Sequence, residues 1–308
     1  MPMQPPFREK PLWYQCLLLV TLLAGSFVIT SLFTLIVPVI YHIPLSEMSG
    51  SGHSPGFVAA MRLDQLIGSI GIMLVPSLLF YRLTQSEPWE RLGLKSSGSG
   101  WYYPVALIVV LVSIPMVQVL AEWNQHLHLP RALSGLDKWM RDTEQDNDAL
   151  IERLLTMPRV TDMLANLLVM ALIPALCEEV FFRGVLQKLF VNATRSPIAG
   201  ILIGAAVFSA LHGQFLGFFS RMALGVVLGC LYWYSRSLWP CILAHFAYNG
   251  VQVLYFYIQQ HQSGGATSPF FDDKTIMPLS YGLISTALVA GGLILIKRLS
   301  DKRSPTWL

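Results

Sequence analysis

The sequence predicts an all-α fold, a polytopic membrane helix bundle with about eight transmembrane helices. Hydrophobic residues make up 54% of the 308 residues and charged residues only 13%, whereas soluble domains carry about 25% charged residues. Mean hydropathy is +0.53. Apolar runs of about 20 residues, the length that spans a bilayer, recur along the chain. These observations indicate an integral membrane protein with the lipid bilayer as a partner.

Eight predicted spans follow one another along the chain. They cover residues 14–41, 62–82, 102–121, 162–190, 197–213, 217–235, 237–259 and 278–297. The first run is too long for the hydrophobic region of a signal peptide, which has about 7–15 residues, so we expect it to be retained as a span. The first and fourth runs are longer than a bilayer requires. We expect Pro38 and Pro174 to kink them.

The only long polar stretch, residues 122–160, has the pattern of an amphipathic helix. Its apolar residues alternate with charges at helical spacing: Leu136, Trp139, Met140, Leu150, Ile151, Leu154 and Leu155. Two placements of this segment remain open. It could cap the end of the bundle or lie on the membrane surface.

Basic residues indicate the orientation, because short loops rich in Lys and Arg lie on the cytoplasmic side of a membrane. With eight spans, most basic residues outside the 122–160 segment fall on one side: Arg8, Lys10, Arg82, Arg91, Lys95, Arg183, Lys188, Arg195, Arg236, Lys297, Arg298, Lys302 and Arg303. Both termini are therefore predicted to be cytoplasmic. The 122–160 segment, whose charge is mixed, is expected outside.

Composition also excludes some classes of function. The net charge of +3 is small and the basic residues lie mainly in loops and tails, so nucleic acid is not an expected partner. All four cysteines lie in apolar segments without C-x-x-C spacing, so they are predicted to be small buried residues rather than disulfides: Cys16, Cys177, Cys230 and Cys241. Two G-x-x-x-G patterns, at residues 200–204 and 225–229, predict close packing of helices.

Two adjacent glutamates, Glu178 and Glu179, lie inside the long apolar run of the fourth span. A carboxylate at membrane depth is costly unless it is protonated, paired or hydrated, so it indicates a functional site. Glu179 and Arg183 are four residues apart, in the order that favours an ion pair on a helix. We therefore expect them to pair and to support the structure. Glu178 points about 100° away and has no local partner.

Three further polar residues lie in apolar surroundings: His212, His245 and Asn249. His245 and Asn249 share a helical face. We expect all three to converge on Glu178, although the span limits place His212 at the far end of its helix and the others nearer mid-span. A carboxylate and an imidazole can hold and deprotonate water, and a second imidazole and an amide can donate hydrogen bonds to an oxyanion. This set suffices to hydrolyse an amide or ester.

Other interpretations of the same residues remain open. Glu178, His212 and His245 could bind a metal ion such as zinc with one open position for water, although the HExxH signature is absent. The same residue types could form a proton-coupled transport pathway, although pairs of broken-helix repeats are not apparent. Each group could also make only a structural hydrogen bond between helices.

Three short motifs occur in a defined order: E-E-x-x-x-R at residues 178–183, F-x-x-x-H at 208–212 and H-x-x-x-N at 245–249. Together they resemble the motifs of the CPBP intramembrane protease family. This family includes the type II CAAX prenyl endopeptidases and the Abi proteins. The resemblance covers about residues 160–260, and the sequence around the motifs is similar to that of bacterial members of the family.

The resemblance implies an intramembrane endopeptidase. Carried over residue by residue, it makes Glu178 and His212 the pair that activates a water molecule, and it makes His245 and Asn249 the oxyanion hole. The second glutamate and the arginine of the first motif would support the site. The family is called metalloprotease by convention, so the resemblance would allow a zinc ion as a cofactor.

The resemblance also implies an organisation and partners. Residues 1–150 would hold the N-terminal spans and the amphipathic segment, residues 160–260 the protease core, and residues 261–308 the last span and a basic cytoplasmic tail. The expected substrate is a peptide or a membrane protein, and the expected location is a bacterial inner membrane. A non-catalytic Abi-type immunity or regulatory protein is the alternative.

Overall fold

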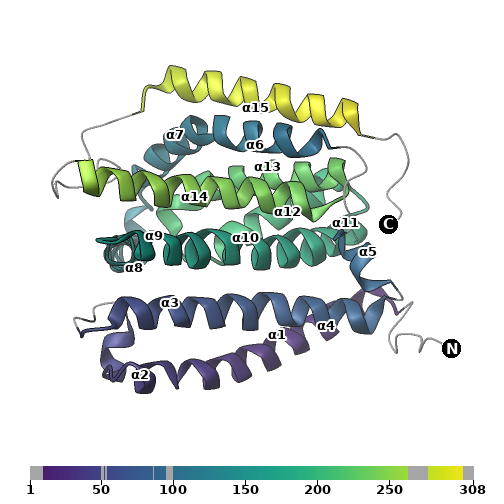
Figure 1. Cartoon of the computed structure of the whole chain (residues 1–308). Coiled ribbons are helices and arrows are strands. Elements are labelled where there is room, and N and C mark those ends of the chain that lie inside the picture. Colours follow the sequence, from purple (N-terminus) through teal and green to yellow (C-terminus); the bar gives the residue numbers. More distant parts are fainter. Residues whose placement is uncertain are drawn as a thin grey trace.

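The computed structural model describes residues 10–49, 52, 54–85, 87–94, 100–262 and 277–300. All regular elements in this part of the chain are helical. The long helices lie roughly along a common axis and pack into one bundle (Figure 1). The predicted all-α membrane bundle is therefore confirmed.

The helices of the first half are α1 (Leu12–Thr34), α2 (Val37–Ile40), α3 (Phe57–Gly68), α4 (Val75–Thr84), α5 (Pro88–Leu92), α6 (Tyr102–Val112), α7 (Ile114–Gln125) and α8 (Ser134–Leu154). Those of the second half are α9 (Val160–Asn166), α10 (Ile173–Glu178), α11 (Lys188–Thr194), α12 (Pro197–Ala210), α13 (Phe218–Ser235), α14 (Leu238–Gln262) and α15 (Leu279–Leu299). Three π-helical segments widen the longer helices: η2 (Ser69–Leu74), η4 (Leu167–Leu172) and η5 (Glu179–Gln187). Three short 3-10 turns complete the described elements: η1 (Leu45–Ser49), η3 (Arg131–Leu133) and η6 (Phe215–Gly217).

Seven helical segments among the described residues are long and apolar enough to cross a membrane: Leu12–Ile40, Phe57–Thr84, Tyr102–Gln125, Val160–Thr194, Phe215–Ser235, Leu238–Gln262 and Leu279–Leu299. The predicted span at 197–213 is the exception. It is α12, an apolar helix of only 14 residues. At 1.5 Å per residue α12 is about 21 Å long, which is less than the hydrocarbon core of about 30 Å.

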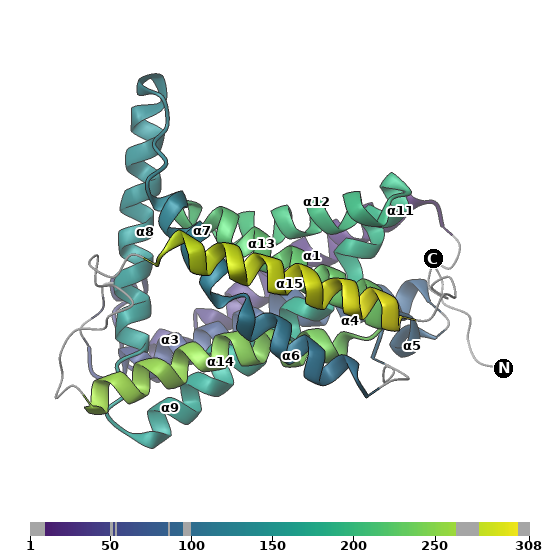
Figure 2. The same cartoon turned by 90° about the horizontal axis from the view of Figure 1, so that it is seen from above.

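Most of the described basic residues outside the 122–160 segment lie at one end of the bundle. α1 begins at the end at which α15 finishes, and α5 and α11 lie at that same end (Figures 1 and 2). This end carries described basic residues: Lys10, Arg82, Arg91, Arg195, Arg236, Lys297 and Arg298. The opposite end carries α8, whose acidic residues alternate with Lys138, Arg141 and Arg153. The cytoplasmic position of the basic end stays a prediction, and Arg8, Lys95, Lys302, Arg303 and the basic tail lie outside the described residues.

Helix α8 differs in direction from the rest of the bundle. It lies across one end at a steep angle to the other helices, and its N-terminal part projects beyond them (Figure 2). Its C-terminal part is anchored, because Leu154 and Leu155 are each only 5% exposed. In the projecting part Leu136 and Trp139 are 45% and 53% exposed. The C-terminal part therefore caps the bundle, and a position of the projecting part on the membrane surface stays a prediction.

The π-helical segments η2 and η4 each end two residues before a proline, Pro76 and Pro174 respectively. Proline has no N–H and its ring clashes with the carbonyl four residues earlier, so the helix must widen or kink there. For Pro174 the released acceptor is the carbonyl of Met170. The side-chain amide of Asn249 donates to it at 3.3 Å. A neighbouring helix thus satisfies a backbone group that proline releases inside the bundle.

The four cysteines are not all buried as predicted. Cys177 and Cys241 are buried, whereas Cys230 is partly exposed and Cys16 is exposed. Cys16 lies on α1, and most side chains of this helix face away from the bundle. An apolar residue on a membrane helix can face lipid instead of protein, so hydropathy does not decide its burial.

The glycine patterns mark close contacts between helices. A Cβ atom at Gly200 would lie 2.7 Å from the backbone nitrogen of Val191 on α11. A Cβ atom at Gly225 would lie 3.1 Å from the Cα atom of Ala205 on α12. These distances confirm the close approach predicted for helices carrying the two patterns.

Replacement of Gly200 by alanine should therefore destabilise the bundle. The added methyl group would meet backbone atoms that cannot move independently, and overpacking of this kind costs about 1–3 kcal/mol. The measurement is the midpoint of thermal unfolding in detergent. Gly25→Ala is the matched control, because a Cβ atom there would have no neighbour within 4 Å. Equal midpoints for the two variants would contradict the packing argument.

Candidate active site

The three motifs meet in the middle of the bundle. Glu178 ends α10, Glu179 begins η5, and His245 and Asn249 lie on α14. His212 lies in the turn after α12. Because α12 has only 14 residues, its last turn reaches the middle of the bundle instead of the far end. The predicted span limits place His212 at the far end of its helix and the other site residues nearer mid-span. Because α12 is short, His212 lies at the depth of the others.

Glu179 and Arg183 form the ion pair that their spacing predicts. Arg183 Nη1 lies 2.9 Å from Glu179 Oε1, and the side chains are 3% and 0% exposed. The alignment of these two atoms is not that of a hydrogen bond, so Arg183 Nη1 is buried without a hydrogen-bond partner. Glu179 Oε2, the other oxygen of the carboxylate, is also buried without one. Arg183 Nη2 donates to the carbonyl of Gly225 at 3.3 Å. The guanidinium also lies 4.7 Å from the ring centre of Phe208.

His245 contacts both glutamates. Its Nδ1 lies 2.8 Å from Glu179 Oε1 and its Nε2 lies 3.8 Å from Glu178 Oε2. We assign the proton to Nδ1, because an ionised carboxylate can only accept. The two glutamates therefore share His245 as a neighbour. Glu179 pairs with Arg183 and also orients His245, which lies between the two carboxylates.

His212 is held by the end of its own helix. Its Nδ1 lies 2.7 Å from the carbonyl oxygen of Phe208. That carbonyl belongs to the last turn of α12, where acceptors have no partner within the helix. The bond leaves Nε2 of His212 for other partners. The aromatic ring of Phe208 packs edge-on against His212 at 4.8 Å between ring centres, and lies 6.2 Å from that of His245.

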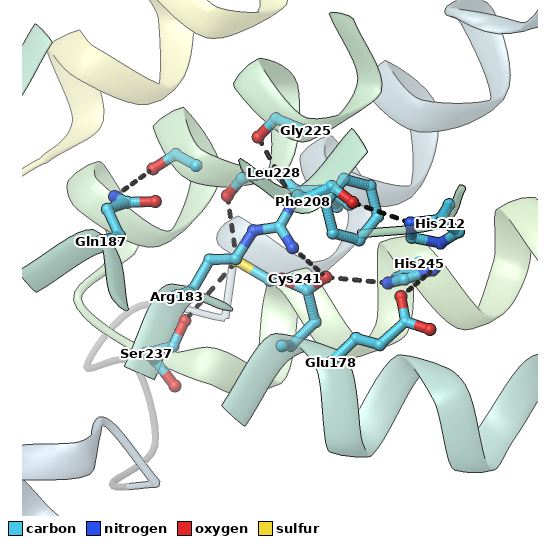
Figure 3. Close-up of polar contacts among 12 residues, drawn as sticks. Glu178, Arg183, Gln187, Phe208, His212, Gly225, Leu228, Ser237, Cys241 and His245 are labelled. Carbon is cyan, nitrogen blue, oxygen red and sulfur yellow. Dashed lines mark hydrogen bonds and ion pairs between the residues drawn. The ribbon is translucent and has the colours of Figure 1, made fainter. Parts of the chain in front are cut away.

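Figure 3 shows Glu178, His212 and His245 turned toward one another, with Phe208 beside the two histidines. Phe208 contacts the rings of both histidines, and His245 Nε2 lies 3.8 Å from Glu178 Oε2. The expected convergence is thus present for these three residues. Asn249 is the exception, because its amide donates to the Met170 carbonyl. An amide nitrogen carries two hydrogens, so one of them remains available.

The two carboxylates differ in access to solvent. The side chain of Glu178 is 14% exposed, whereas that of Glu179 is fully buried and that of His245 is 4% exposed. Glu178 is therefore the carboxylate that a small molecule can reach. Glu179, bound on one side by Arg183 and on the other by His245, is suited to orient and to stabilise charge.

The donors of the predicted metal site do not fit one in this conformation. Within the described ranges of the chain, no three His, Cys, Asp or Glu side chains are grouped so that they could hold a metal ion. The ring nitrogen of His245 that is not bonded to Glu179 is Nε2, which lies 3.8 Å from Glu178 Oε2. Zinc bound by Glu178, His212 and His245 stays a prediction, and no chemical step below depends on it.

Sequence reasoning missed two contacts of the site. The bond from Glu179 to His245 joins residues 66 positions apart, and no local pattern signals it. The bond from Asn249 to the Met170 carbonyl had a signal in Pro174, because a proline in a helix releases the acceptor four residues earlier. Arg183, counted among the basic loop residues, is instead buried in the site.

Loss of Arg183 should destabilise the protein strongly. In Arg183→Ala the carboxylate of Glu179 would stay buried without its cation, and breaking a buried pair in this way costs about 3–5 kcal/mol. Thermal unfolding in detergent measures the change. Arg298→Ala, an exposed arginine near the end of α15, is the control and should unfold like the wild type. A wild-type midpoint for Arg183→Ala would show that the pair does not stabilise the fold.

Comparison with known proteins agrees with the motifs. Residues 160–251 match the model of the family described as type II CAAX prenyl endopeptidase Rce1-like. All three motifs fall inside this segment. Searches of the curated proteins and of the solved structures found no match. This match confirms the resemblance of residues 160–251 to the CPBP intramembrane proteases.

Proposed function

We propose that this protein is an intramembrane endopeptidase that hydrolyses a peptide bond with a water molecule activated by Glu178 and His212. The observation that carries the proposal is the position of His245 between a buried carboxylate and a reachable one. Such an arrangement separates two tasks. One carboxylate can take part in proton transfer, while the other fixes the imidazole.

Glu178 is the proposed general base. Its partly exposed carboxylate would take a proton from water as the water oxygen attacks the substrate carbonyl carbon. The same proton would then pass to the leaving nitrogen as the peptide bond breaks, a task for which a positioned acid–base group suffices. His212 would hold the water through Nε2, because its Nδ1 is fixed on the Phe208 carbonyl.

His245 and Asn249 are the proposed donors to the oxyanion. With Nδ1 bound to Glu179, a protonated His245 would direct Nε2–H toward the developing charge, and Glu179 would stabilise the imidazolium as the aspartate does in a serine protease triad. Asn249 would donate the hydrogen that Met170 does not use. Donors held rigidly in a buried site stabilise a transition state more strongly than they would in water.

An apolar pocket on the helix that carries His245 supports a membrane-borne substrate. It encloses about 440 Å³ and is lined by Tyr103, Leu172, Trp239, Ile242, Leu243 and Phe246. Four of these residues lie on α14, the helix that carries His245 and Asn249. We propose that an apolar part of the substrate occupies it. The family description makes a prenylated C-terminal C-a-a-X sequence the first substrate to test.

We also propose a sidedness. The basic end of the bundle would face the cytoplasm of a bacterial cell, since Lys and Arg in short loops favour that side of the membrane. The end covered by α8 would then face outward. The proposal is supported by the described basic residues outside the 122–160 segment, most of which lie at the end where α1 begins and α15 finishes.

Glu178→Gln should abolish cleavage while leaving the fold intact. The amide has nearly the same shape but cannot accept the proton, and loss of general-base catalysis lowers rates about 10²–10⁴-fold. The assay uses purified protein in detergent and a quenched fluorogenic peptide ending in S-farnesylcysteine and three further residues. Glu87→Gln, an exposed glutamate before α5, should cleave like the wild type. Wild-type cleavage by Glu178→Gln would contradict the assignment, and a cellular phenotype that survives this substitution would favour the non-catalytic alternative.

Cleavage should also survive removal of metal ions. The three candidate ligands are not grouped as a metal site. We expect the rate on the same peptide to be unchanged after treatment with a chelator, and we expect elemental analysis to find zinc well below one atom per chain. Loss of cleavage that added zinc restores would instead establish the predicted metal site.

A further inference from the structure

A buried asparagine outside the three motifs is bonded at both ends of its amide. Asn124, near the end of α7, is 3% exposed. Its Nδ2 donates to the carbonyl of Phe215 at 3.0 Å, and its Oδ1 accepts from the backbone N–H of Phe219 at 3.1 Å. A buried amide is costly unless its polar atoms are paired. Both polar atoms of the Asn124 amide are therefore paired, and both partners lie within residues 215–219.

The segment that Asn124 binds follows His212 directly. α12 ends at Ala210, so His212 lies on a turn, and Gly213 has a left-handed conformation with φ of +67°. Residues in a turn lack the continuous hydrogen bonds that fix a side chain on a helix. His212 bonds to Phe208 on the preceding helix. On the other side of the turn, Arg221 of α13 donates to the backbone carbonyl of Gln214 at 2.8 Å and to its side-chain oxygen at 2.6 Å, and Asn124 binds the residues that follow.

The contacts of this turn come from several elements. Ser209 Oγ donates to the carbonyl of Phe218 at 2.6 Å and so joins the end of α12 to the start of α13. Glu144 on α8 accepts from the backbone N–H of Leu216 at a longer distance of 3.4 Å. Among these contacts Asn124 is the side chain that binds both the 3-10 turn η6 and the start of α13.

We propose that Asn124 is a positioning residue for His212, a role that rests on the function proposed for that histidine. It would act by fixing the loop that follows the imidazole, without touching the substrate. Displacement of a catalytic group by about 1 Å can lower a rate about 100-fold. Two bonds from one rigid amide restrict the loop at Phe215 and at Phe219 together.

A second buried asparagine offers a matched comparison. Asn166 is fully buried, donates to the carbonyl of Leu154 at 2.6 Å and accepts from Arg62 Nε at 2.8 Å. It ties α9 to α8 and α3, and it has no bond to the His212 turn. Loss of its amide removes the same chemistry from another part of the bundle.

The experiment compares Asn124→Ala, Asn124→Asp and Asn166→Ala. Rates are measured on the farnesylated fluorogenic peptide, and amide hydrogen exchange is measured over residues 211–219. In Asn124→Ala we expect kcat to fall about 10–100-fold with KM within about twofold of the wild type, since the loop moves but the pocket does not. Asn124→Asp keeps the size and the acceptor, but its carboxylate cannot donate to the Phe215 carbonyl, so it should also lower kcat and speed exchange.

Asn166→Ala should lower the unfolding midpoint as Asn124→Ala does, but with kcat within about twofold of the wild type and slow exchange in the loop. An equal fall in kcat for Asn166→Ala would reduce Asn124 to a structural role and overturn the proposal. Wild-type loop exchange in Asn124→Asp would overturn it whatever the peptide assay shows. Wild-type cleavage by Glu178→Gln would refute only the proposed function, because the exchange data decide separately whether Asn124 holds the loop.

Discussion

The site depends on the contacts that Glu179 makes with Arg183 and with His245. A carboxylate with no exposure to solvent is stable only if opposite charge and hydrogen bonds replace water. Arg183 supplies the charge from the same helix and His245 supplies the hydrogen bond from α14. This contact joins the fourth spanning segment to α14. It therefore brings the ring of His245 next to Glu178, the carboxylate that solvent can reach.

The irregular parts of the helices have a common consequence for the site. Pro174 releases the carbonyl of Met170, and Asn249 satisfies it from α14. The π-helical segment that begins at Glu179 continues the distortion through Arg183. π-helical turns are rare and often occur at functional sites. Here the bond from Asn249 to the Met170 carbonyl and the bond from His245 to Glu179 attach the same two helices to each other, so the backbone irregularity also positions polar side chains.

The shortness of α12 provides the third element of the site. A helix of full length would carry His212 to the end of the bundle, whereas 14 residues leave it at the depth of Glu178. Non-helical backbone at membrane depth is tolerated only when protein or a polar cavity surrounds it. The side chains of Asn124, Ser209 and Glu144 meet this requirement by bonding the backbone of residues 215–219.

The sequence by itself determined the helical membrane bundle, the position of most spans and the Glu179–Arg183 pair. Hydropathy reports where a helix can enter lipid, and residues four apart on a helix are always neighbours. Only the tertiary structure decided that His245 lies between both glutamates and that Asn249 takes the Met170 carbonyl. These contacts join residues 66 and 79 positions apart. They depend on the angle, depth and rotation at which two helices pack, and no local spacing encodes these quantities.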